Sequence, residues 1–456
     1  MSAHPAAAAG AEAIRAARAT HPDLAWAEVF VTDLNGLQRG KLVPIESLDK
    51  VAKGGLRMPV STLGLDILGE DVAGAGIAIE RGDPDGPLIP VPGAIGPMLW
   101  ADRPTLQVPC VLWEGDAPCA YDPRAVLGAQ VEALTAQGLS ATMAFELEFY
   151  LIDPTEPRPP IDEHGRRLPE TRDQIYELSV LRGFRGLMEA IIAASHALGA
   201  PAETAIAEFG AGQFELNLRH VPDPLAAADH LMALKRVIRG CARGQGLDAS
   251  FMAKPYGEKS GSGLHVHVSL ADREGRGVFD AGEGPVPAPR AGHALAGLTE
   301  TMPDAMLIWA PHQNSYRRPV PGSYAPMVAA WGLDNRGAAL RMPETVGPGA
   351  RIEHRVAGAD ANPYLVGAAI LAGMVHGFDR GAPPPPPVAS EAKPDQGPDL
   401  PLEWRAAEVR LSASKTLQDR LGAEFVRVFT GVKRQERAKL LARVSDVEYE
   451  TYLRTV

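Results

Sequence analysis

The sequence predicts an α+β protein with a small N-terminal unit and a larger second unit. The first half of the stretch WAEVFVTDLNGLQRGKLVP and the run ATMAFELEFYLID alternate apolar and polar side chains, as half-buried strands do. Amphipathic segments with helical spacing lie between the later strand-like runs. A chain of 456 residues, 45% of them apolar, is long enough for two or three domains and a large core.

The first part of the chain predicts a small β unit. Residues 1–22 are typical of an arm followed by a short alanine-rich helix. The stretch WAEVFVTDLNGLQRGKLVP predicts a β-hairpin from Trp26 to Val43, because Asp33-Leu34-Asn35-Gly36 is a strong turn signal. Short strands and turns follow to about residue 111. We predict a boundary near residues 115–123, which gives domains at 20–117 and 118–456.

The second unit is predicted to begin with a helix at Asp122-Pro123-Arg124, where proline takes the first helical position. The run ATMAFELEFYLID then alternates, so Glu146 and Glu148 share one face of a strand. The opposite face carries Phe145, Leu147 and Phe149. This pattern indicates a sheet with one packed face and one face that lines a cleft.

The middle of the chain alternates predicted loops, helices and strands. Residues 154–172 predict a surface loop, and residues 174–198 a long amphipathic helix. The run AEFGAGQFELNL places Glu208 and Glu215 on either side of a glycine-containing turn, which we interpret as a bent or bulged strand. A helix at about 225–244 and a strand at 248–255 follow.

Residues 254–270, KPYGEKSGSGLHVHVSL, are typical of a glycine-rich loop that leads into a strand. On a strand, His265, His267 and Ser269 point the same way. Gly261 and Gly263 let the backbone approach a ligand closely. Two imidazoles and a hydroxyl directed at one point suit a metal ion and a phosphate.

The C-terminal part supplies arginines and helices. NSYRRPVPGSYAP has the composition of a mobile loop, and Glu353 and Arg355 lie two apart on one strand face. DANPYLVGAAILAGMVHG predicts a capped helix, the proline-rich segment after it predicts a loop, and residues 403–456 predict helices. The arginines of this part that we expect at the cleft are Arg318, Arg336, Arg341, Arg351 and Arg355.

Composition and charge exclude several functions. The net charge of −11 argues against a nucleic-acid partner, whose contact surfaces are basic. Three cysteines without metal-ligand spacing fit a reducing, cytoplasmic location. We find no signal peptide and no apolar run long enough to cross a membrane, so no membrane partner is expected.

The combination of carboxylates, imidazoles and arginines indicates metal-dependent chemistry on a polyanion. Oxygen ligands with one nitrogen favour Mg²⁺ or Mn²⁺ over Zn²⁺. Arginines beside such ions favour phosphate and carboxylate groups and are the parts of phosphoryl-transfer sites. A single Glu-x-Glu or His-x-His is more often structural, but several together on strand-like segments favour function. The chain lacks a GxxxxGK[ST] loop, which excludes a P-loop enzyme.

The sequence resembles the glutamine synthetase superfamily in segments that occur in family order. The segments are NGLQRGK, FELEFYL, EFGAGQFELN, FMAKP, SGSGLHVHVSL, NSYRR, NRGAALRMP, ARIEHR and DANPYL. The resemblance implies an N-terminal β-grasp domain and a catalytic domain with an antiparallel sheet and flanking helices. It also implies a homo-oligomer, a dodecamer of two hexameric rings, in which a neighbour's N-terminal domain completes each site.

The resemblance further implies a role for each matching residue, with ATP and Mg²⁺ (or Mn²⁺) as cofactors. One metal would be held by Glu146, His265 and Glu353, and the other by Glu148, Glu208 and Glu215. Nucleotide and phosphate contacts would come from Glu203, His267, Ser269, Arg336, Arg341 and Arg351. Glutamate contacts would come from Gly261, Arg318 and Arg355. Arg336, Arg318 and Glu353 would be catalytic, with Arg336 stabilising the transferring phosphoryl group.

Two departures from the family pattern indicate the second substrate. Ammonia-using members carry a glutamate in a flap that resembles PGYEAP, and here Tyr324 stands at that position. They also carry an aspartate in FDGSS, and here Pro59 replaces it within Met58-Pro59-Val60-Ser61-Thr62. A small hydrated cation needs such anionic partners away from water. An aromatic and an apolar side chain suit the alkyl part of a larger amine, so Tyr324 is expected to contact substrate.

The sequence therefore predicts an enzyme similar to γ-glutamylpolyamine synthetases and other glutamate–amine ligases. It would join the γ-carboxylate of glutamate to a polyamine, ethanolamine or another alkyl- or arylamine through a γ-glutamyl phosphate intermediate. Glutamine synthetase activity with ammonia is the first alternative. A non-catalytic structural or regulatory homologue and a metal-dependent hydrolase are the others, and the complete set of metal-type residues and arginines disfavours both.

Overall fold

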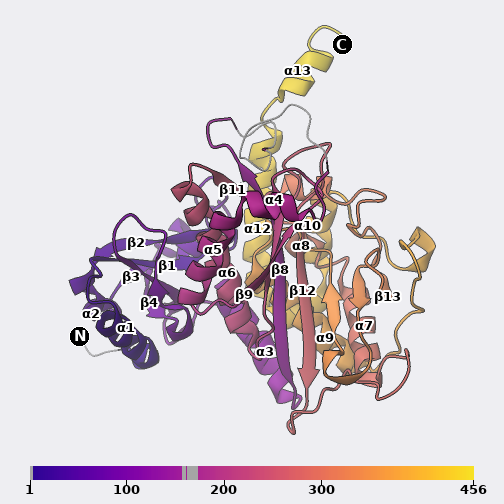
Figure 1. The fold of residues 1–456 in the computed structure, drawn as a ribbon, viewed down its shortest axis with the longest axis horizontal. Helices are drawn as coiled ribbons and strands as arrows, with labels where there is room; N and C mark the ends of the chain where they lie inside the picture. The colour runs from indigo at the N-terminus through magenta and orange to yellow at the C-terminus, as the bar shows by residue number, and fades with distance from the viewer. Residues whose placement is uncertain (1–3, 157–160, 162–172) are drawn as a thin grey trace.

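A computed structural model describes residues 4–156, 161 and 173–456, and the predicted loop at 154–172 lies largely outside these residues. The chain forms two sheets that belong to two units of unequal size (Figure 1). The small unit, in indigo and violet, stands to one side of a larger body of long strands and helices. The predicted α+β class is confirmed.

The small unit is a mixed sheet with strands in the order β2-β1-β6-β4-β3, to which β5 and β7 add at β6. Its central pair, β1 and β6, is parallel, and β1 pairs with β2 in the predicted antiparallel hairpin, with Trp26 opposite Pro44. Helices α1 (Ala8–Thr20) and α2 (Leu48–Val51) pack beside it. The strands are β1 (Trp26–Thr32), β2 (Gln38–Pro44), β3 (Arg57–Pro59), β4 (Asp85–Pro90), β5 (Gly96–Pro97), β6 (Thr105–Glu114) and β7 (Ala117–Pro118).

The large unit is built on a second sheet with strands in the order β13-β14-β15-β12-β8-β10-β9, and β11 pairs with β8. All of its pairs are antiparallel except β13 with β14. The strands are β8 (Ser140–Ile152), β9 (Ala202–Ala207), β10 (Gln213–Leu218), β11 (Asp248–Ser250), β12 (Leu264–Ala271), β13 (Trp331–Leu333), β14 (Leu340–Met342) and β15 (Ile352–His354). The predicted division at residue 117/118 stays a prediction, because one continuous core joins the two units.

Helices pack on the large sheet, and three of the longest begin as their sequences predict. Asp122, Asp223 and Asn362 cap α3, α6 and α9 by accepting hydrogen bonds from the first-turn amides, and each is followed by proline. The helices are α3 (Pro123–Ala136), α4 (Leu178–Gly183), α5 (Arg185–Ala197), α6 (Pro224–Gly244), α7 (Pro289–Thr301), α8 (Met306–Trp309), α9 (Pro363–Arg380), α10 (Trp404–Ala413), α11 (Lys415–Leu421), α12 (Ala423–Leu441) and α13 (Asp446–Tyr452).

Three predicted elements differ in the structure. The single helix at 174–198 is wrong, because α4 and α5 meet at Phe184, whose non-helical backbone lets its ring pack edge-on against Phe214. Glu208 and Glu215 do not lie on one bent strand but on either side of a turn that joins β9 to β10 as a hairpin. The strand predicted at 248–255 covers only β11, after which the chain leaves the sheet.

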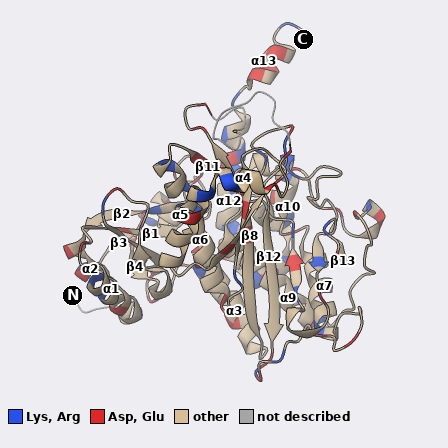
Figure 2. Ribbon diagram, viewed as in Figure 1, with Lys and Arg blue, Asp and Glu red and all other residues tan. Residues whose placement is uncertain are grey.

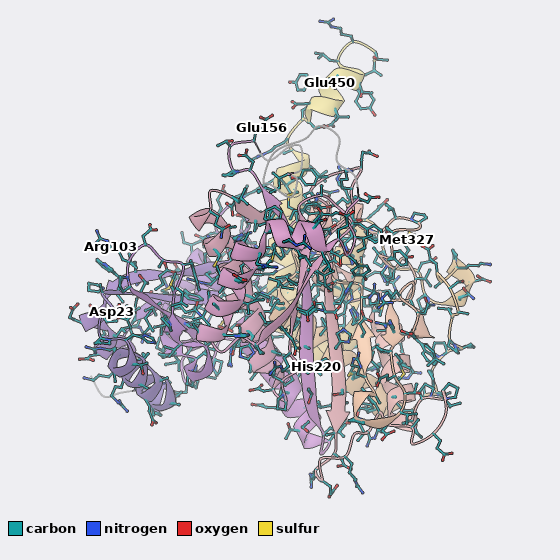
Figure 3. The ribbon with its side chains drawn as sticks, in the orientation of Figure 1. Asp23, Arg103, Glu156, His220, Met327 and Glu450 are labelled. Carbon is teal, nitrogen blue, oxygen red and sulfur yellow. The ribbon has the colours of Figure 1, made fainter. Side chains whose placement is uncertain are left out.

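The last helix, α13, extends away from the rest of the molecule (Figure 1). Figure 3 labels Glu450 on this helix, well apart from the body. Its side chains and those next to it include exposed apolar groups, at Val447, Tyr449, Tyr452 and Leu453.

Acidic and basic residues are intermixed along the ribbon (Figure 2). Within the described residues, no helix combines the length and apolarity that a bilayer crossing requires.

A buried ionic network joins the first hairpin to α12. Lys433 and Glu436 are both fully buried and lie 3.1 Å apart. Lys433 donates to the amide oxygen of Asn35, and Glu436 accepts from the Asn35 amide at 2.8 Å and from the Ile67 backbone at 2.9 Å. Each buried charge therefore has a charged or hydrogen-bonding partner.

The substitution Lys433→Met is expected to destabilise the protein strongly. It leaves the Glu436 carboxylate buried without its cation, which costs about 3–5 kcal/mol in comparable sites. In urea unfolding, the urea concentration at the midpoint of the transition should be clearly lower than for the wild type. The matched control is Lys415→Met, because the Lys415–Asp419 pair is exposed and such pairs contribute about 0–1 kcal/mol. Equal midpoints for the two variants would contradict this account.

Candidate active site

A cavity of about 410 Å³ lies against the polar face of the large sheet. Its floor consists of carboxylates and an imidazole, and arginines form one wall. The predicted site residues that line it are Glu146, Glu148, Glu208, Glu215, Gly261, His265, Arg318, Tyr324, Arg336, Arg341, Glu353 and Arg355. Most of the predicted site residues thus line one cavity, although the first and the last of them are more than 200 positions apart in the sequence.

Strand register brings the ionisable side chains together. Glu146 on β8 lies opposite His265 on β12, and Glu148 lies opposite Glu215 on β10. Glu146 contacts Nδ1 of His265 at 3.3 Å and Nε2 of His267 at 3.0 Å. On the far side of β12, Glu353 of β15 approaches Nδ1 of His265 to 4.0 Å. Alternation along each strand puts all of these groups on the same face.

Two groups of side chains have the spacing of metal ligands. Within each group the donor atoms lie within 4.8 Å of one another. The groups are Glu146, His265 and Glu353, and Glu148, Glu215 and His265. The first is the triad named from the sequence. The second pairs Glu148 and Glu215 with His265, whereas Glu208, which was expected there, lines the same cavity without joining the group.

Mutual repulsion and burial separate the pKa values of the acids. Burial, together with the neighbouring carboxylates, raises the pKa of Glu215 to about 9 and that of Glu208 to about 7. Burial opposes ionisation of Glu146 as well, but hydrogen bonds from His265 and His267 hold its pKa below the ordinary range. Arg355 and the histidines outweigh burial at Glu353 and lower its pKa to about 2.

This donor set fits a divalent cation. Four or more carboxylates in one buried space repel one another, so they cannot all be ionised without a large cost in free energy. A divalent cation that replaces the protons removes this repulsion. The donors are carboxylate oxygens with one imidazole, which suits Mg²⁺ or Mn²⁺. Glu146, Glu353 and His265 on one side, and Glu148 and Glu215 on the other, are the residues that would hold such ions.

The arginines along the wall are held by the acids and by backbone carbonyls. Arg341 donates to Glu353 at 2.8 Å, and Arg355 also donates to Glu353. Arg318 is buried and donates to the carbonyls of Val356 at 2.9 Å and Arg355 at 3.4 Å. A Cβ at residue 263 would lie 2.6 Å from the Arg318 guanidinium, so Gly263 is needed for this close approach. The wall is thus a fixed cationic surface.

Four residues predicted to contact nucleotide lie outside the cavity lining. His267 lies between Glu146 and Arg351, whose Nε is 3.2 Å from its Nδ1. Ser269 lies further along β12, opposite Thr142. Glu203 is half exposed on β9 and pairs with Arg219 at 3.4 Å. His267 and Ser269 therefore extend from the cavity along β12, with Arg351 beside His267, and the roles of these residues and of Glu203 stay predictions.

Sequence reasoning missed several residues around the site. Tyr176 and Phe209 line the cavity mouth beside Tyr324, and their exposed fractions are 67%, 40% and 60%. Tyr176 and Tyr324 both have positive φ angles, 59° and 55°, which are uncommon for aromatic residues. His220 packs edge-on against His267. The wrong helix at 174–198 hid Tyr176, and a lone histidine carries no signal of its own.

Ile175, Ile206 and Ser323 also line this cavity. Pro59, which replaces the family aspartate, lies at the end of β3 in the small unit. It is not among the residues that line this cavity. The predicted contribution of a neighbouring chain near Pro59 stays a prediction.

Fold and site together define an α+β protein whose large sheet carries a carboxylate-rich metal site bordered by arginines. The family model for the catalytic domain of glutamine synthetase matches residues 120–452. The chain therefore belongs to the glutamine synthetase family.

Several named relatives are similar over most of their length. The chain is 37% identical to gamma-glutamylputrescine synthetase PuuA of Escherichia coli K12, over 95% of this chain and 93% of the relative. It is 32% identical to a glutamate–isopropylamine ligase of a Pseudomonas species, over 79% of both chains. The solved structure of apo GmaS has a TM-score of 0.83 at 26% identity and covers 96% of this chain and 98% of that one.

Proposed function

We propose that this protein is an ATP-dependent ligase that joins the γ-carboxylate of glutamate to an organic amine. The observation that carries the proposal is the aromatic and apolar cavity mouth, where Tyr324 stands at the position of a family glutamate. The relatives named as gamma-glutamylputrescine synthetase and glutamate–isopropylamine ligase support it, because both names describe glutamate joined to an amine. A solved GmaS complex with ADP supports a nucleotide in the site.

In the proposed chemistry, the arginines of the cavity bind glutamate and stabilise the transferring phosphoryl group. Arg318 and Arg355 bind the carboxylates of glutamate, since guanidinium pairs well with carboxylate. Arg336 and Arg341 neutralise charge on the phosphoryl group while it passes from ATP to the γ-carboxylate. The γ-glutamyl phosphate that forms is then attacked by the amine nitrogen, and phosphate leaves.

Bound divalent cations would supply charge neutralisation at the phosphates and the acyl oxygen. Glu146, His265 and Glu353 would hold one ion, and Glu148 and Glu215 would hold the other, with Glu208 beside them. Glu353 also fixes Arg341 and Arg355 through its two oxygens, so one carboxylate orients both the arginines and the metal.

The amine end of the cavity has both features that an alkylammonium ion needs. The acidic side chains of the same cavity, Glu208 among them, offer negative charge to an alkylammonium ion. Tyr176, Phe209 and Tyr324 offer apolar surface for the carbon chain. An ammonium ion has no carbon chain to pack on this surface, so we expect the enzyme to prefer organic amines over ammonia.

The first test is phosphate release from ATP with Mg²⁺, glutamate and a panel of putrescine, ethanolamine, isopropylamine and ammonia. We expect at least one organic amine to exceed ammonia by about 100-fold in kcat/KM, the discrimination that a built pocket can reach. The product mass should equal glutamate plus amine minus water. In a second arm, the variant Tyr324→Glu should favour ammonia and so reduce the ratio of kcat/KM for the organic amine to kcat/KM for ammonia.

Three outcomes of this panel have different meanings. Faster turnover of ammonia than of every organic amine would favour glutamine synthesis. No release with any amine in the presence of glutamate would contradict the ligase proposal. An unchanged ratio of ammonia to organic amine in Tyr324→Glu would contradict the assignment of this residue to the amine site, and leave the reaction itself supported.

We also propose the dodecameric state and the cytoplasmic location that the sequence predicts. The exposed apolar side chains of α13 support assembly, because a short helix that stands apart from the body is stabilised by a second chain. The three cysteines are free and buried, which is compatible with a reducing compartment. Light scattering of the purified protein would measure the assembly directly.

A further inference from the structure

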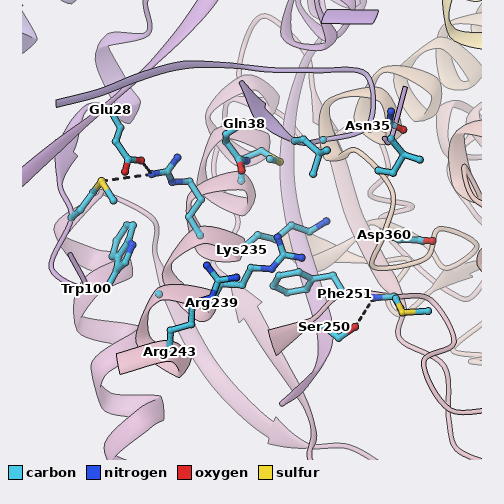
Figure 4. Close-up of a pocket in the computed structure, with 18 of the residues that line it drawn as sticks. Glu28, Asn35, Gln38, Trp100, Lys235, Arg239, Arg243, Ser250, Phe251 and Asp360 are labelled. Carbon is cyan, nitrogen blue, oxygen red and sulfur yellow. Dashed lines mark hydrogen bonds and ion pairs between the residues drawn. The ribbon is translucent and has the colours of Figure 1, made fainter. Parts of the chain in front are cut away.

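A second cavity, of about 950 Å³, lies where the small unit meets α6 of the large one (Figure 4). The small unit contributes Glu28, Gln38 and Trp100, and the large unit contributes one face of α6 and the segment after β11. None of its lining residues belongs to the lining of the active-site cavity. We call this second cavity the interdomain groove.

Four basic residues of α6 line the interdomain groove, at Lys235, Arg236, Arg239 and Arg243. Two of them are neutralised, because Arg236 pairs with Glu28 and Arg243 with Asp248. Lys235 donates to the backbone carbonyls of Ala359 and Ala361, at 2.6 and 3.3 Å, and pairs with no carboxylate among the described residues. Burial lowers the pKa of Lys235 to about 7, so the cationic charge without a salt bridge comes mainly from Arg239.

Arg239 is the least satisfied of the four. Its side chain is exposed to the groove, and its one hydrogen bond within the described chain is a 3.4 Å contact from Nε to the Ala249 carbonyl. The guanidinium lies 4.9 Å from the centre of the Phe251 ring, which fixes its position. Both terminal nitrogens of the fork are thus available to a ligand, and a guanidinium fork matches carboxylate and phosphate oxygens.

Aromatic surface faces these cations. Trp100 packs closely against α6 at Gly240, where a Cβ would approach its indole ring to 1.9 Å. Figure 4 shows Trp100 on one side of the groove and Phe251 on the other, with Arg239 between them. The groove also contains acids besides Glu28, at Asp102 and Asp360, and Ser315 donates to Asp360 at 2.6 Å. A groove of this size exceeds an inorganic ion and suits an organic molecule.

We propose that the interdomain groove binds a small organic oxyanion, a metabolite that carries a carboxylate or a phosphate group. Arg239 binds the oxyanion, and Trp100 covers the carbon skeleton. The inference does not depend on the proposed ligase reaction, because none of the residues involved lines the active-site cavity. In a chain with a net charge of −11, an exposed arginine without a salt bridge among the described residues is a specific feature of this groove that bulk charge does not explain.

The test is isothermal titration of the full-length protein with succinate, a dicarboxylate, and with glycerol 3-phosphate, a phosphate monoester. We expect saturable binding of at least one probe, and the tighter probe identifies the preferred oxyanion. Arg239→Gln should weaken that binding by about tenfold or more, as expected for the loss of a charge-assisted pair. Gln38→Glu, which adds a negative charge to the groove wall at nearly constant shape, should weaken it as well.

Two controls separate this site from other anion binding. Arg355→Gln removes an arginine of the active-site cavity and should leave the groove affinity unchanged. Arg410→Gln makes the same charge change in α10, where Arg410 pairs with Asp304, and should also leave it unchanged. Far-ultraviolet circular dichroism and thermal unfolding check that each variant is folded. Binding lost in Arg355→Gln but kept in Arg239→Gln, or no saturable binding of either probe, would overturn the proposal.

Discussion

Replacing Glu215 with glutamine is expected to reduce metal-dependent turnover by about a thousandfold or more, the scale on which removal of a metal ligand acts. Glu215 lies opposite Glu148 in the sheet and belongs to the second metal-type group. Glutamine keeps the size of the side chain but cannot supply an anionic oxygen. Phosphate release under saturating substrates measures the loss.

The same variant should be at least as stable as the wild type without metal. With a pKa near 9, Glu215 is protonated at neutral pH in the metal-free protein, and glutamine reproduces that neutral form. Thermal unfolding in a chelating buffer should therefore report an unchanged or higher midpoint. Glu132→Gln, on the exposed face of α3, is the matched control and should keep full turnover. Full activity of Glu215→Gln would remove this residue from the metal site.

Binding of Mg²⁺ to the metal-free protein is expected to be strongly pH-dependent. Protons on Glu215 and Glu208 compete with the cation, and their pKa values of about 9 and about 7 are raised by burial and by neighbouring carboxylates. Between pH 6 and pH 8 the apparent affinity should rise roughly 10²- to 10³-fold, since ligands must lose their protons to bind metal. Calorimetry in buffers of different ionisation enthalpy should detect the released protons.

The stability of the metal-free protein should change in the opposite direction. Both carboxyl groups hold protons more tightly in the folded state, because their pKa values lie above the ordinary 4.5. Their contribution to stability is complete below about pH 4.5 and is lost as the pH rises through 7 and towards 9. From pH 6 to 8 the loss summed over both groups is about 4 kcal/mol, and saturating Mg²⁺ should restore it.

A Mg²⁺ affinity that is the same at pH 6 and pH 8 would contradict the proton competition. Glu215→Gln provides the internal control, because it removes the group with the highest pKa of the cluster. In that variant the pH dependence of metal-free stability should become shallower. If the free energy of unfolding of the variant changed with pH as steeply as that of the wild type, the pH dependence would come from residues other than Glu215.

The elements that could be predicted from the sequence are those with strong local signals. Asp33-Leu34-Asn35-Gly36 predicted the hairpin, and the Asp33 carboxylate accepts from the amides of Asn35 and Leu37. Asp122 and Asn362 predicted helix starts because their caps are local hydrogen bonds. Alternation along β8 and β12 predicted which side chains share a face, and the family resemblance assigned Glu146 and His265 to one metal; the strand register places them opposite each other.

The features that escaped prediction depend on contacts between distant segments. The break at Phe184 follows from ring packing against Phe214, thirty residues later, and the flanking Gly183 and Gly186 are only a weak local signal of it. Tyr176 was hidden by that wrong helix. The interdomain groove joins Trp100 to Arg239, and periodicity cannot pair residues so far apart.

The buried network between Asn35 and α12 has a consequence for synthesis on the ribosome. The Asn35–Glu436 bond joins residues that are 401 positions apart. At translation rates of about 5–20 residues per second, the turn of the first hairpin waits roughly 20–80 seconds for its partner to be made. Until then the polar groups of this turn remain in water, and the small unit lacks the helix that completes its core. The nascent chain must therefore stay soluble in a partly assembled form until α12 has been made.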